Sequence, residues 1–210
     1  IPHMTEHQTI KKENPGRPEG AAGAKMLERM NRSHEPLRAF AFPLLPWREN
    51  MRILDVGCGG GAAIAEMLKL SPGSVIQGID YSETSVRESS LLNREFLGSR
   101  CFIRQADAAA LPFEDNSFDL VTAVETVYFW PDIQAGFREI FRVLKPTGTF
   151  AILNEGSDPD RSDWPKIDGF MKIYRPEELE ALLSGCGFQE VQVHHGPEQI
   201  ICVTGGKPRL

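Results

Sequence analysis

The sequence predicts a doubly wound α/β fold, in which a mostly parallel sheet carries helices on both faces. Short apolar runs alternate with helical patterns along residues 52–153, and this alternation is typical of parallel strands linked by right-handed crossovers. A glycine-rich turn follows the first apolar run, at residues 57–61. Two further strand-like runs, at 191–194 and 200–204, are joined by a connection too short for a crossover. We therefore expect this last pair to be antiparallel.

Each expected element follows from its own pattern. Apolar runs of strand length, bounded by turn-forming residues, predict strands at 52–56, 75–79, 101–105, 118–124 and 149–153. Apolar residues at helical spacing predict helices at 61–70, 82–96, 132–144 and 177–183. Ser82 and Asp132 are expected to cap the helices that they begin, and the Pro-Thr-Gly run at 146–148 to end the third of these helices.

The first part of the chain differs in composition from the rest. Residues 1–24 are predicted to be a polar N-terminal extension, in which His3-Met4 is typical of a cloning remnant and the Pro- and Gly-rich stretch 11–24 favours disorder. Residues 25–210 are expected to form a single domain. Its first segment, 25–42, is predicted to be a helix broken near Pro36. This helix either closes a ligand pocket as a lid or only covers an edge of the sheet.

Composition excludes several classes of function. The net charge of −6 over 210 residues argues against a nucleic-acid partner. There is no apolar run of about 18 residues, so we expect no membrane span. The four cysteines form no C-x-x-C pair and no secretory signal is present, which favours a cytoplasmic protein. Because no Cys or His residues stand at metal-binding spacing, we expect no metal ion.

The most informative segment is the Ile-Leu-Asp-Val-Gly-Cys-Gly-Gly-Gly run at 53–61. Glycines after a buried strand let the backbone turn sharply and approach a nucleoside or nucleotide. Asp55, just before the turn, suits a cationic ammonium better than a pyrophosphate, which it would repel. S-adenosylmethionine carries such an ammonium. Asp80 ends the second strand, where a carboxylate can accept hydrogen bonds from both hydroxyls of a ribose.

Four motifs in this order resemble the class I S-adenosylmethionine-dependent methyltransferases, in particular the small single-domain branch that includes the ubiquinone and menaquinone biosynthesis enzymes. They lie at 54–61, at 77–82, at 105–108 with 111–113 and 118–121, and at 137–148. The resemblance covers about residues 52–205. It implies a Rossmann-like methyltransferase fold with a seven-stranded sheet, mostly parallel, whose last strand is antiparallel.

The resemblance and the strand ends together predict a site for S-adenosylmethionine. Tyr81 would lie beside the adenine. By resemblance, Asp107 would accept from the adenine amino group and Ala108 would donate from its backbone. Each carboxylate could instead cap a loop, and Cys58 could be merely a small residue that fits the turn. The candidate cofactor-binding residues are Asp55, Gly57, Cys58, Gly59, Gly61, Asp80, Tyr81, Ser82, Asp107, Ala108 and Glu125.

The predicted reaction moves the methyl of S-adenosylmethionine to an O, N or C atom of a small-molecule acceptor and releases S-adenosylhomocysteine. Proximity and orientation would supply most of the catalysis, so no catalytic residue is assigned. Aromatic residues at 128–130, and those of the insert 156–174, are expected to help build the acceptor pocket. Candidates for a general base, none of them favoured, are Glu125, Tyr128, Trp130, Glu155 and His194-His195.

Two other functions fit parts of the same pattern. A nicotinamide-dependent oxidoreductase is one, because Gly57-x-Gly59-x-x-Ala62 fits the dinucleotide fingerprint. The other is a non-catalytic, methyltransferase-like subunit that serves a partner. The sequence predicts neither the acceptor's identity nor the oligomeric state.

Overall fold

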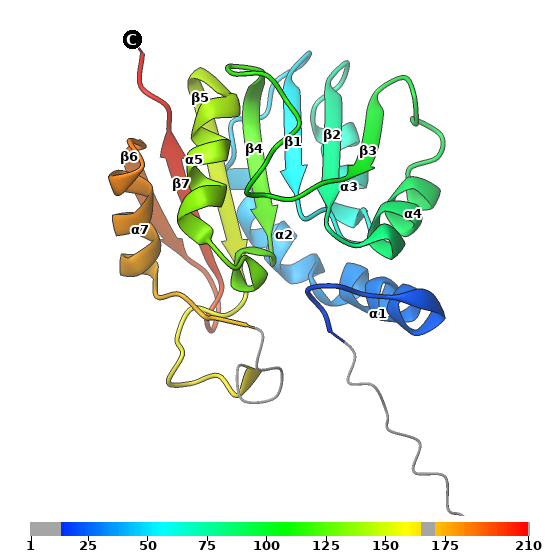
Figure 1. The fold of residues 1–210 in the computed structure, drawn as a ribbon. Coiled ribbons are helices and arrows are strands. Elements are labelled where there is room, and N and C mark those ends of the chain that lie inside the picture. Colours follow the sequence, from blue (N-terminus) through cyan, green and yellow to red (C-terminus); the bar gives the residue numbers. More distant parts are fainter. Residues whose placement is uncertain (1–13, 165–170, 210) are drawn as a thin grey trace, which may run out of the picture.

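The computed structural model describes residues 14–164 and 171–209 of the chain. Within them, seven strands form one sheet in the order β3-β2-β1-β4-β5-β7-β6 (Figure 1). Strands β1 to β5 run parallel to one another, and β7 is antiparallel to both β5 and β6. The strands are β1 (Arg52–Val56), β2 (Val75–Asp80), β3 (Cys101–Gln105), β4 (Phe118–Val124), β5 (Leu144–Asn154), β6 (Gln189–His195) and β7 (Ile201–Gly206).

This topology confirms the predicted fold class, including the reversed last strand. The strand order reverses between β1 and β4. The segments that follow these two strands therefore lead away from each other, and they leave room for a ligand at the carboxyl ends of the strands. The short connection between β6 and β7 forces the antiparallel pairing that the sequence predicts, with His195 opposite Ile201.

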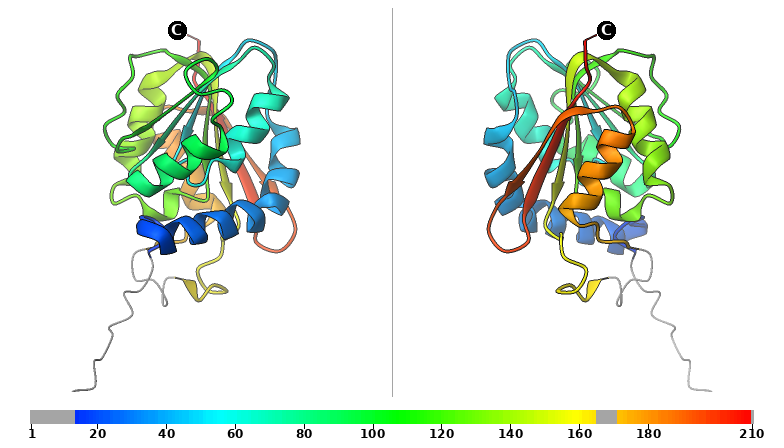
Figure 2. Two further views of the ribbon diagram at one scale, coloured as in Figure 1. Left: turned by 90° about the vertical axis from the view of Figure 1, so that its right-hand side faces the viewer. Right: turned by 90° about the vertical axis from the view of Figure 1, so that its left-hand side faces the viewer.

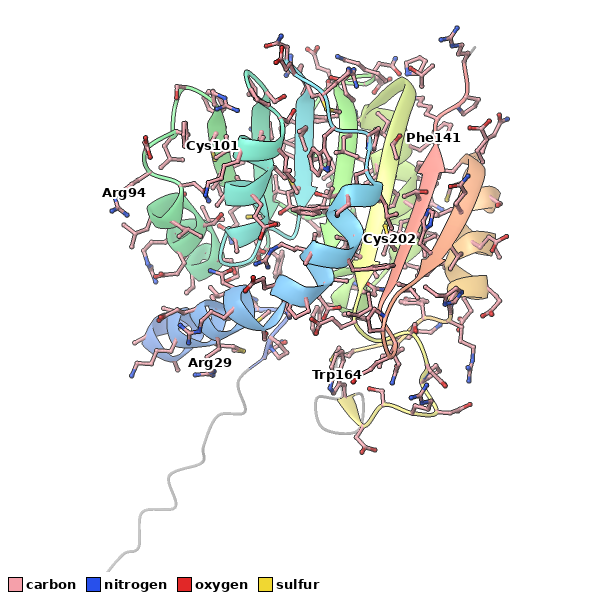
Figure 3. The ribbon with its side chains drawn as sticks, turned by 180° about the vertical axis from the view of Figure 1, so that it is seen from behind. Arg29, Arg94, Cys101, Phe141, Trp164 and Cys202 are labelled. Carbon is pink, nitrogen blue, oxygen red and sulfur yellow. The ribbon has the colours of Figure 1, made fainter. Side chains whose placement is uncertain are left out.

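Helices cover both faces of the sheet. Helices α2 and α3 pack on one face and α5 and α7 on the other, while α4 lies beside the β3 edge (Figures 1 and 3). No helix in the described part of the chain is long and apolar enough to cross a bilayer. The helices are α1 (Gly20–Ser33), α2 (Glu35–Ala41), α3 (Ala62–Leu70), α4 (Glu83–Leu92), α5 (Ile133–Val143) and α7 (Pro176–Gly185), with short 3-10 turns at Phe42–Leu44 and Val127–Phe129.

An apolar layer fills each side of the sheet. On the α5 side, the ring of Phe137 packs edge-on against Phe150 with 5.4 Å between centroids, and Phe150 in turn contacts Phe188. On the α3 side, Ile64 and Met67 are fully buried among residues of β1 and β2. These two layers hold the sheet rigid, so that its strand ends stay in fixed positions.

The predicted caps are present, and two helices end earlier than expected. Ser82 accepts from the Ser85 amide at 3.2 Å, and Asp132 accepts from the Ala135 amide at 3.0 Å. Helix α4 ends at Leu92 rather than at residue 96: Asn93 leaves the helical conformation, and its side chain donates to the carbonyls of Ser89 and Gly61. Helix α5 ends at Val143, and β5 begins at once, so that the run at 146–148 is an irregularity inside a strand ladder.

The N-terminal segment is more ordered than its composition predicts. Residues 1–13 lie outside the described part, but 14–19 have a defined path and α1 begins at Gly20, inside the stretch expected to be disordered. Contacts with α4 fix it: the Ser82 hydroxyl donates to the Pro18 carbonyl at 2.5 Å, and the Gly20 amide donates to Thr84 Oγ1 at 3.2 Å. The predicted helix break falls at His34, and Pro36 sits in the first turn of α2, where proline is tolerated.

Candidate active site

A cavity of about 750 Å³ lies at the carboxyl ends of β1, β2 and β4. Helix α1 runs across this edge of the sheet, below the strand ends, as both views of Figure 2 show. Open parallel sheets bind ligands at this place, where the strand order reverses. The cavity is lined by residues from 14–18, from α1, from the glycine turn, from the ends of β2 and β4, from the loop 106–109, and from 171–174.

Backbone angle and lack of space both require glycine in the glycine turn. Gly57 has φ +78°, and a Cβ there would overlap Thr126 Oγ1. Gly61 has φ +86°, and a Cβ there would meet the Ser89 hydroxyl at 2.6 Å. L side chains rarely adopt such angles. The turn therefore brings bare backbone to the cavity, and α3 begins directly after it.

The Asp80 carboxylate ties the glycine turn to the end of β2. It accepts from the Gly59 amide at 2.9 Å and from the Ser82 amide at 3.0 Å. Burial raises the pKa of Asp80, and these two hydrogen bonds act in the opposite direction. The carboxylate also lines the cavity, so the predicted ribose site and the glycine turn are parts of one hydrogen-bonded unit.

Asp55 lies on the cavity wall at the end of β1 and is only 1% exposed. The Thr122 hydroxyl donates to it at 2.7 Å. Burial raises the pKa of Asp55 to about 7. A cation placed beside this carboxylate would favour its charged form, as the predicted contact with an ammonium requires.

The residues predicted beside the adenine lie at the cavity rim. Tyr81 is 53% exposed, and the Arg17 guanidinium lies 4.9 Å from the centre of its ring. The Asp107 carboxylate accepts from the Ala109 amide at 2.8 Å, so it caps its own turn, which is the alternative that the sequence left open. Asp107 and Ala108 both line the cavity, and their contact with an adenine stays a prediction.

The structure brings most of the predicted cofactor residues together around this one cavity. The exceptions are Gly61 and Ser82, which are not among the lining residues. Gly61 instead is the residue before α3, and Ser82 caps α4 and binds the Pro18 carbonyl. Both residues therefore act on the site indirectly: Gly61 belongs to the glycine turn, and Ser82 holds residues 14–18, which line the cavity.

Glu125 follows β4 and faces the cavity. It has φ +53°, which is unusual for a residue with a side chain, and the side chain is 7% exposed. It accepts from the Tyr128 hydroxyl at 2.6 Å and from the Glu155 amide. Burial raises the pKa of Glu125 to about 8. His34 Nε2 lies 3.9 Å from its second oxygen, and burial, helped by the charge of Arg38, lowers the pKa of His34 to about 4.

The sequence analysis missed the polar residues that α1 and the start of α2 bring to the cavity. Asn31, His34 and Arg38 line it, and Asn31 Nδ2 donates to the Gly60 carbonyl at 3.2 Å. A signal for them exists, because these residues recur at intervals of three and four and so share one helix face. Residues 14–18, placed in a disordered extension, also line the cavity.

Some of the candidates for a general base and for the acceptor pocket line the cavity, and others lie away from it. His194 and His195 lie on β6, at the far edge of the sheet, and are not among the cavity's lining residues. Met171 and Tyr174 line the cavity, as expected. Trp164, labelled in Figure 3, packs edge-on against Tyr128 with 6.2 Å between ring centroids. Phe170 lies outside the described residues.

The chain is similar to known methyltransferases in sequence. Residues 54–152 match the model of a family described as a methyltransferase domain. A cycloartenol-C-24-methyltransferase of Arabidopsis thaliana is 34% identical over 156 residues, which are 72% of this chain and 45% of that protein. The chain thus spans less than half the length of this relative.

Solved structures share the fold. A methyltransferase of Aquifex aeolicus that depends on S-adenosylmethionine superposes with a TM-score of 0.73 at 19% identity, over 87% of this chain and 97% of that one. Phosphoethanolamine N-methyltransferase 2 of Haemonchus contortus, solved with S-adenosyl-L-methionine, gives a TM-score of 0.69 at 18% identity, over 86% of this chain and 53% of that one. Residues 54–152 therefore match a methyltransferase domain, and the fold and glycine turn are consistent with the class I S-adenosylmethionine-dependent methyltransferases.

Proposed function

We propose that this chain transfers the methyl group of S-adenosylmethionine to an O, N or C atom of a small-molecule acceptor. One observation carries the proposal: Asp55, Asp80 and Glu125, at the ends of three neighbouring strands, line one cavity together with a glycine turn. Loop caps have no reason to converge in this way. A small-molecule acceptor also agrees with the name of the Arabidopsis relative, which acts on cycloartenol.

The residues present fit the cofactor. Asp55 is buried and has one hydrogen-bond donor in the described structure, Thr122, so a cationic ammonium would complete its environment. The N-terminus of α3, which begins directly after the glycine turn, suits a carboxylate. Asp80 would hold the ribose. The cofactor supplies a methyl group already activated on a sulfonium.

The protein's contribution is then positioning and exclusion of water. Residues 14–34 act as a lid in this proposal, because they cross the cavity mouth and contact both the glycine turn and the aromatic wall. Gly16 packs so closely on Phe129 that a Cβ would lie 2.7 Å from its ring, and Leu27 lies beside Gly59. Closing the site keeps water from the sulfonium and holds the acceptor in line with the methyl.

Four further expectations stay proposals. They are a cytoplasmic location, the absence of a nucleic-acid partner, the single-domain organisation of 25–210, and the likeness to the ubiquinone and menaquinone branch in particular. The net charge of −6 supports the second. Because the chain spans under half of its Arabidopsis relative, activity and substrate need direct measurement.

Radiolabelled methyl transfer tests the proposal. The purified chain is incubated with S-adenosylmethionine labelled on its methyl group and a panel of small amines, phenols, carboxylic acids and alkenes. We expect label in at least one acceptor and an equal amount of S-adenosylhomocysteine. Tight cofactor binding with no transfer to any class would instead support the non-catalytic subunit.

A further inference from the structure

Three side chains from distant parts of the sequence meet beside the cavity. They are His34 between α1 and α2, Glu125 after β4, and Glu155 after β5. One ring nitrogen of His34 and one carboxylate oxygen of each glutamate all lie within 4.8 Å of one another. His34 and Glu125 line the cavity, and together the three are called the triad below.

The two glutamates of the triad offer acceptor oxygens, and the neutral His34 ring offers one nitrogen as a further acceptor. One oxygen of Glu125 accepts from Tyr128 and from the Glu155 amide, but the second accepts no hydrogen bond from the described residues, although the side chain is only 7% exposed. The Glu155 carboxylate likewise accepts none within the described ranges. Carboxyl oxygens without a protein donor bind water or the N–H groups of a ligand. A ligand that carries several N–H groups would satisfy them.

The neighbouring cation does not fill this role. Arg38 lines the same cavity and its charge favours the ionised form of Glu155, whose pKa burial raises. Its guanidinium, however, is bound elsewhere: Nε donates to Glu66 at 2.8 Å and Nη2 to the Asn31 carbonyl at 3.0 Å. Neither of these two hydrogen bonds goes to Glu125 or Glu155, so the carboxyl oxygens of the triad remain available to a ligand.

Aromatic rings stand next to the triad. Tyr128, whose hydroxyl binds Glu125, packs edge-on against Phe129 and Trp164, with ring centroids 6.0 Å and 6.2 Å apart. Phe129 and Tyr128 both line the cavity. Aromatic faces attract organic cations and pack against their apolar substituents. Acids and aromatic rings together are the pattern for an organic amine.

We propose that the triad binds the ammonium group of a small amine and that nitrogen is the atom methylated, an inference that rests on the function proposed above. Three acceptors match the three N–H groups of a primary ammonium. Acceptors around a tetrahedral ammonium at about 2.8 Å stand roughly 4.6 Å apart, which agrees with the triad's spread of up to 4.8 Å.

A bare metal ion needs a shorter spacing of ligand atoms than an ammonium does. Ligand atoms about 2.1 Å from a Zn²⁺ stand roughly 3 to 3.4 Å from one another. His34 Nε2 and the Glu125 oxygen are 3.9 Å apart, which lies between the two spacings. The choice of an ammonium over a metal ion therefore rests on the aromatic rings beside the triad, and the metal titration below decides between them.

The transfer balances with groups at the site. The cationic ammonium favours the ionised form of Glu125, which releases its own proton to water when the amine binds. The bound ammonium then gives one proton to this carboxylate, whose pKa burial raises. The nitrogen lone pair then forms the N–C bond while the S–C electron pair returns to sulfur. The products are a methylated ammonium and S-adenosylhomocysteine, and Glu125 later releases its proton to water.

Paired probes of equal shape test the inference. Benzylamine and benzyl alcohol are titrated calorimetrically into the protein preloaded with S-adenosylhomocysteine. We expect the amine to bind at least about tenfold more tightly, equivalent to about 1.4 kcal/mol. Glu155→Gln should remove that preference and leave the affinity for S-adenosylhomocysteine unchanged. Glu180→Gln, an exposed acid on α7, should change neither.

The other outcomes each decide something. Equal affinity for amine and alcohol would overturn the inference, and so would a loss of S-adenosylhomocysteine affinity in Glu155→Gln, which would assign the triad to the cofactor. Stoichiometric binding of Zn²⁺ or Mn²⁺ that His34→Ala abolishes and benzylamine does not displace would also overturn it. Failure of the wild-type chain to bind S-adenosylhomocysteine would count against the proposed function itself.

Discussion

The Tyr128 hydroxyl donates a 2.6 Å hydrogen bond to the Glu125 carboxylate and accepts one of 3.0 Å from the Gly156 amide. It therefore joins the segments that follow β4 and β5, on which the two glutamates of the triad lie. Because Glu125 also has a backbone angle of φ +53°, its position depends on these contacts rather than on local preference.

Tyr128→Phe should therefore destabilise the protein. The change leaves the ring in place but removes the donor to a buried carboxylate, which typically costs about 1–3 kcal/mol. Urea unfolding should show the loss. Tyr81→Phe is the matched control, since that tyrosine is 53% exposed and should change stability little. Equal midpoints for the two variants would contradict this role of Tyr128.

Stability should fall as the pH rises from about 6.5 to about 8.5. Burial raises the pKa of Asp55 to about 7 and of Glu125 to about 8 in the folded protein. The folded chain then holds protons that the unfolded chain has already released, so the stability that these groups contribute is lost as pH passes their folded pKa values. His34, with its lowered pKa, acts in the opposite direction only below about pH 6.5.

Chemical unfolding at several pH values checks this dependence. Glu125→Gln cannot ionise, so its stability should vary less with pH over the same interval. A wild-type stability that rises through this interval would show that the two carboxyls are already ionised in the folded state. Saturating S-adenosylmethionine should reduce the slope, since its ammonium would favour the charged form of Asp55.

Two glycines separate the effect of backbone strain from that of crowding. Gly57 and Gly98 have almost the same angle, φ +78° and φ +79°, but only at Gly57 would an added Cβ have other atoms within 4 Å. Gly98→Ala should cost about 1–2 kcal/mol from strain alone. Gly57→Ala should cost clearly more, because its Cβ would overlap Thr126 Oγ1. Thermal unfolding of both variants tests this, and equal losses would contradict it.

The lid proposal predicts slower hydrogen exchange in residues 14–34 when S-adenosylhomocysteine binds. This segment is fixed by a few hydrogen bonds, such as those from Ser82 to Pro18 and from Asn31 to Gly60, so it should open locally without the ligand. Exchange followed by mass spectrometry would compare it with β6, at the far edge of the sheet. Unchanged exchange in 14–34 would favour a helix that only covers the sheet.

Much of the fold, and the part of the site at the strand ends, could be predicted from local sequence patterns. Strands, caps and the glycine turn depend on short stretches of sequence, so the approach of Asp55 and Asp80 to one cavity could be predicted from strand ends alone. The reversed β7 follows from the short connection before it. These features need no knowledge of distant contacts.

The rest depends on contacts between distant segments. The path of 14–19 is set by α4 and not by its own composition, so a Pro- and Gly-rich stretch there looks disordered in sequence. The triad combines His34 with Glu125 and Glu155, which lie about 90 and about 120 positions later in the sequence. Only the packing of α1 across the strand ends brings them together, and no periodicity reports that packing.

Calorimetric titration of the purified chain with S-adenosylmethionine, S-adenosylhomocysteine and NADH tests the central claim most directly. We expect both adenosyl ligands to bind at about micromolar Kd, NADH not to bind, and Asp80→Asn to weaken the first two at least about tenfold, since it loses a charged acceptor for the ribose hydroxyls. Binding of NADH alone, or no binding of any ligand by a folded protein, would contradict the methyltransferase account.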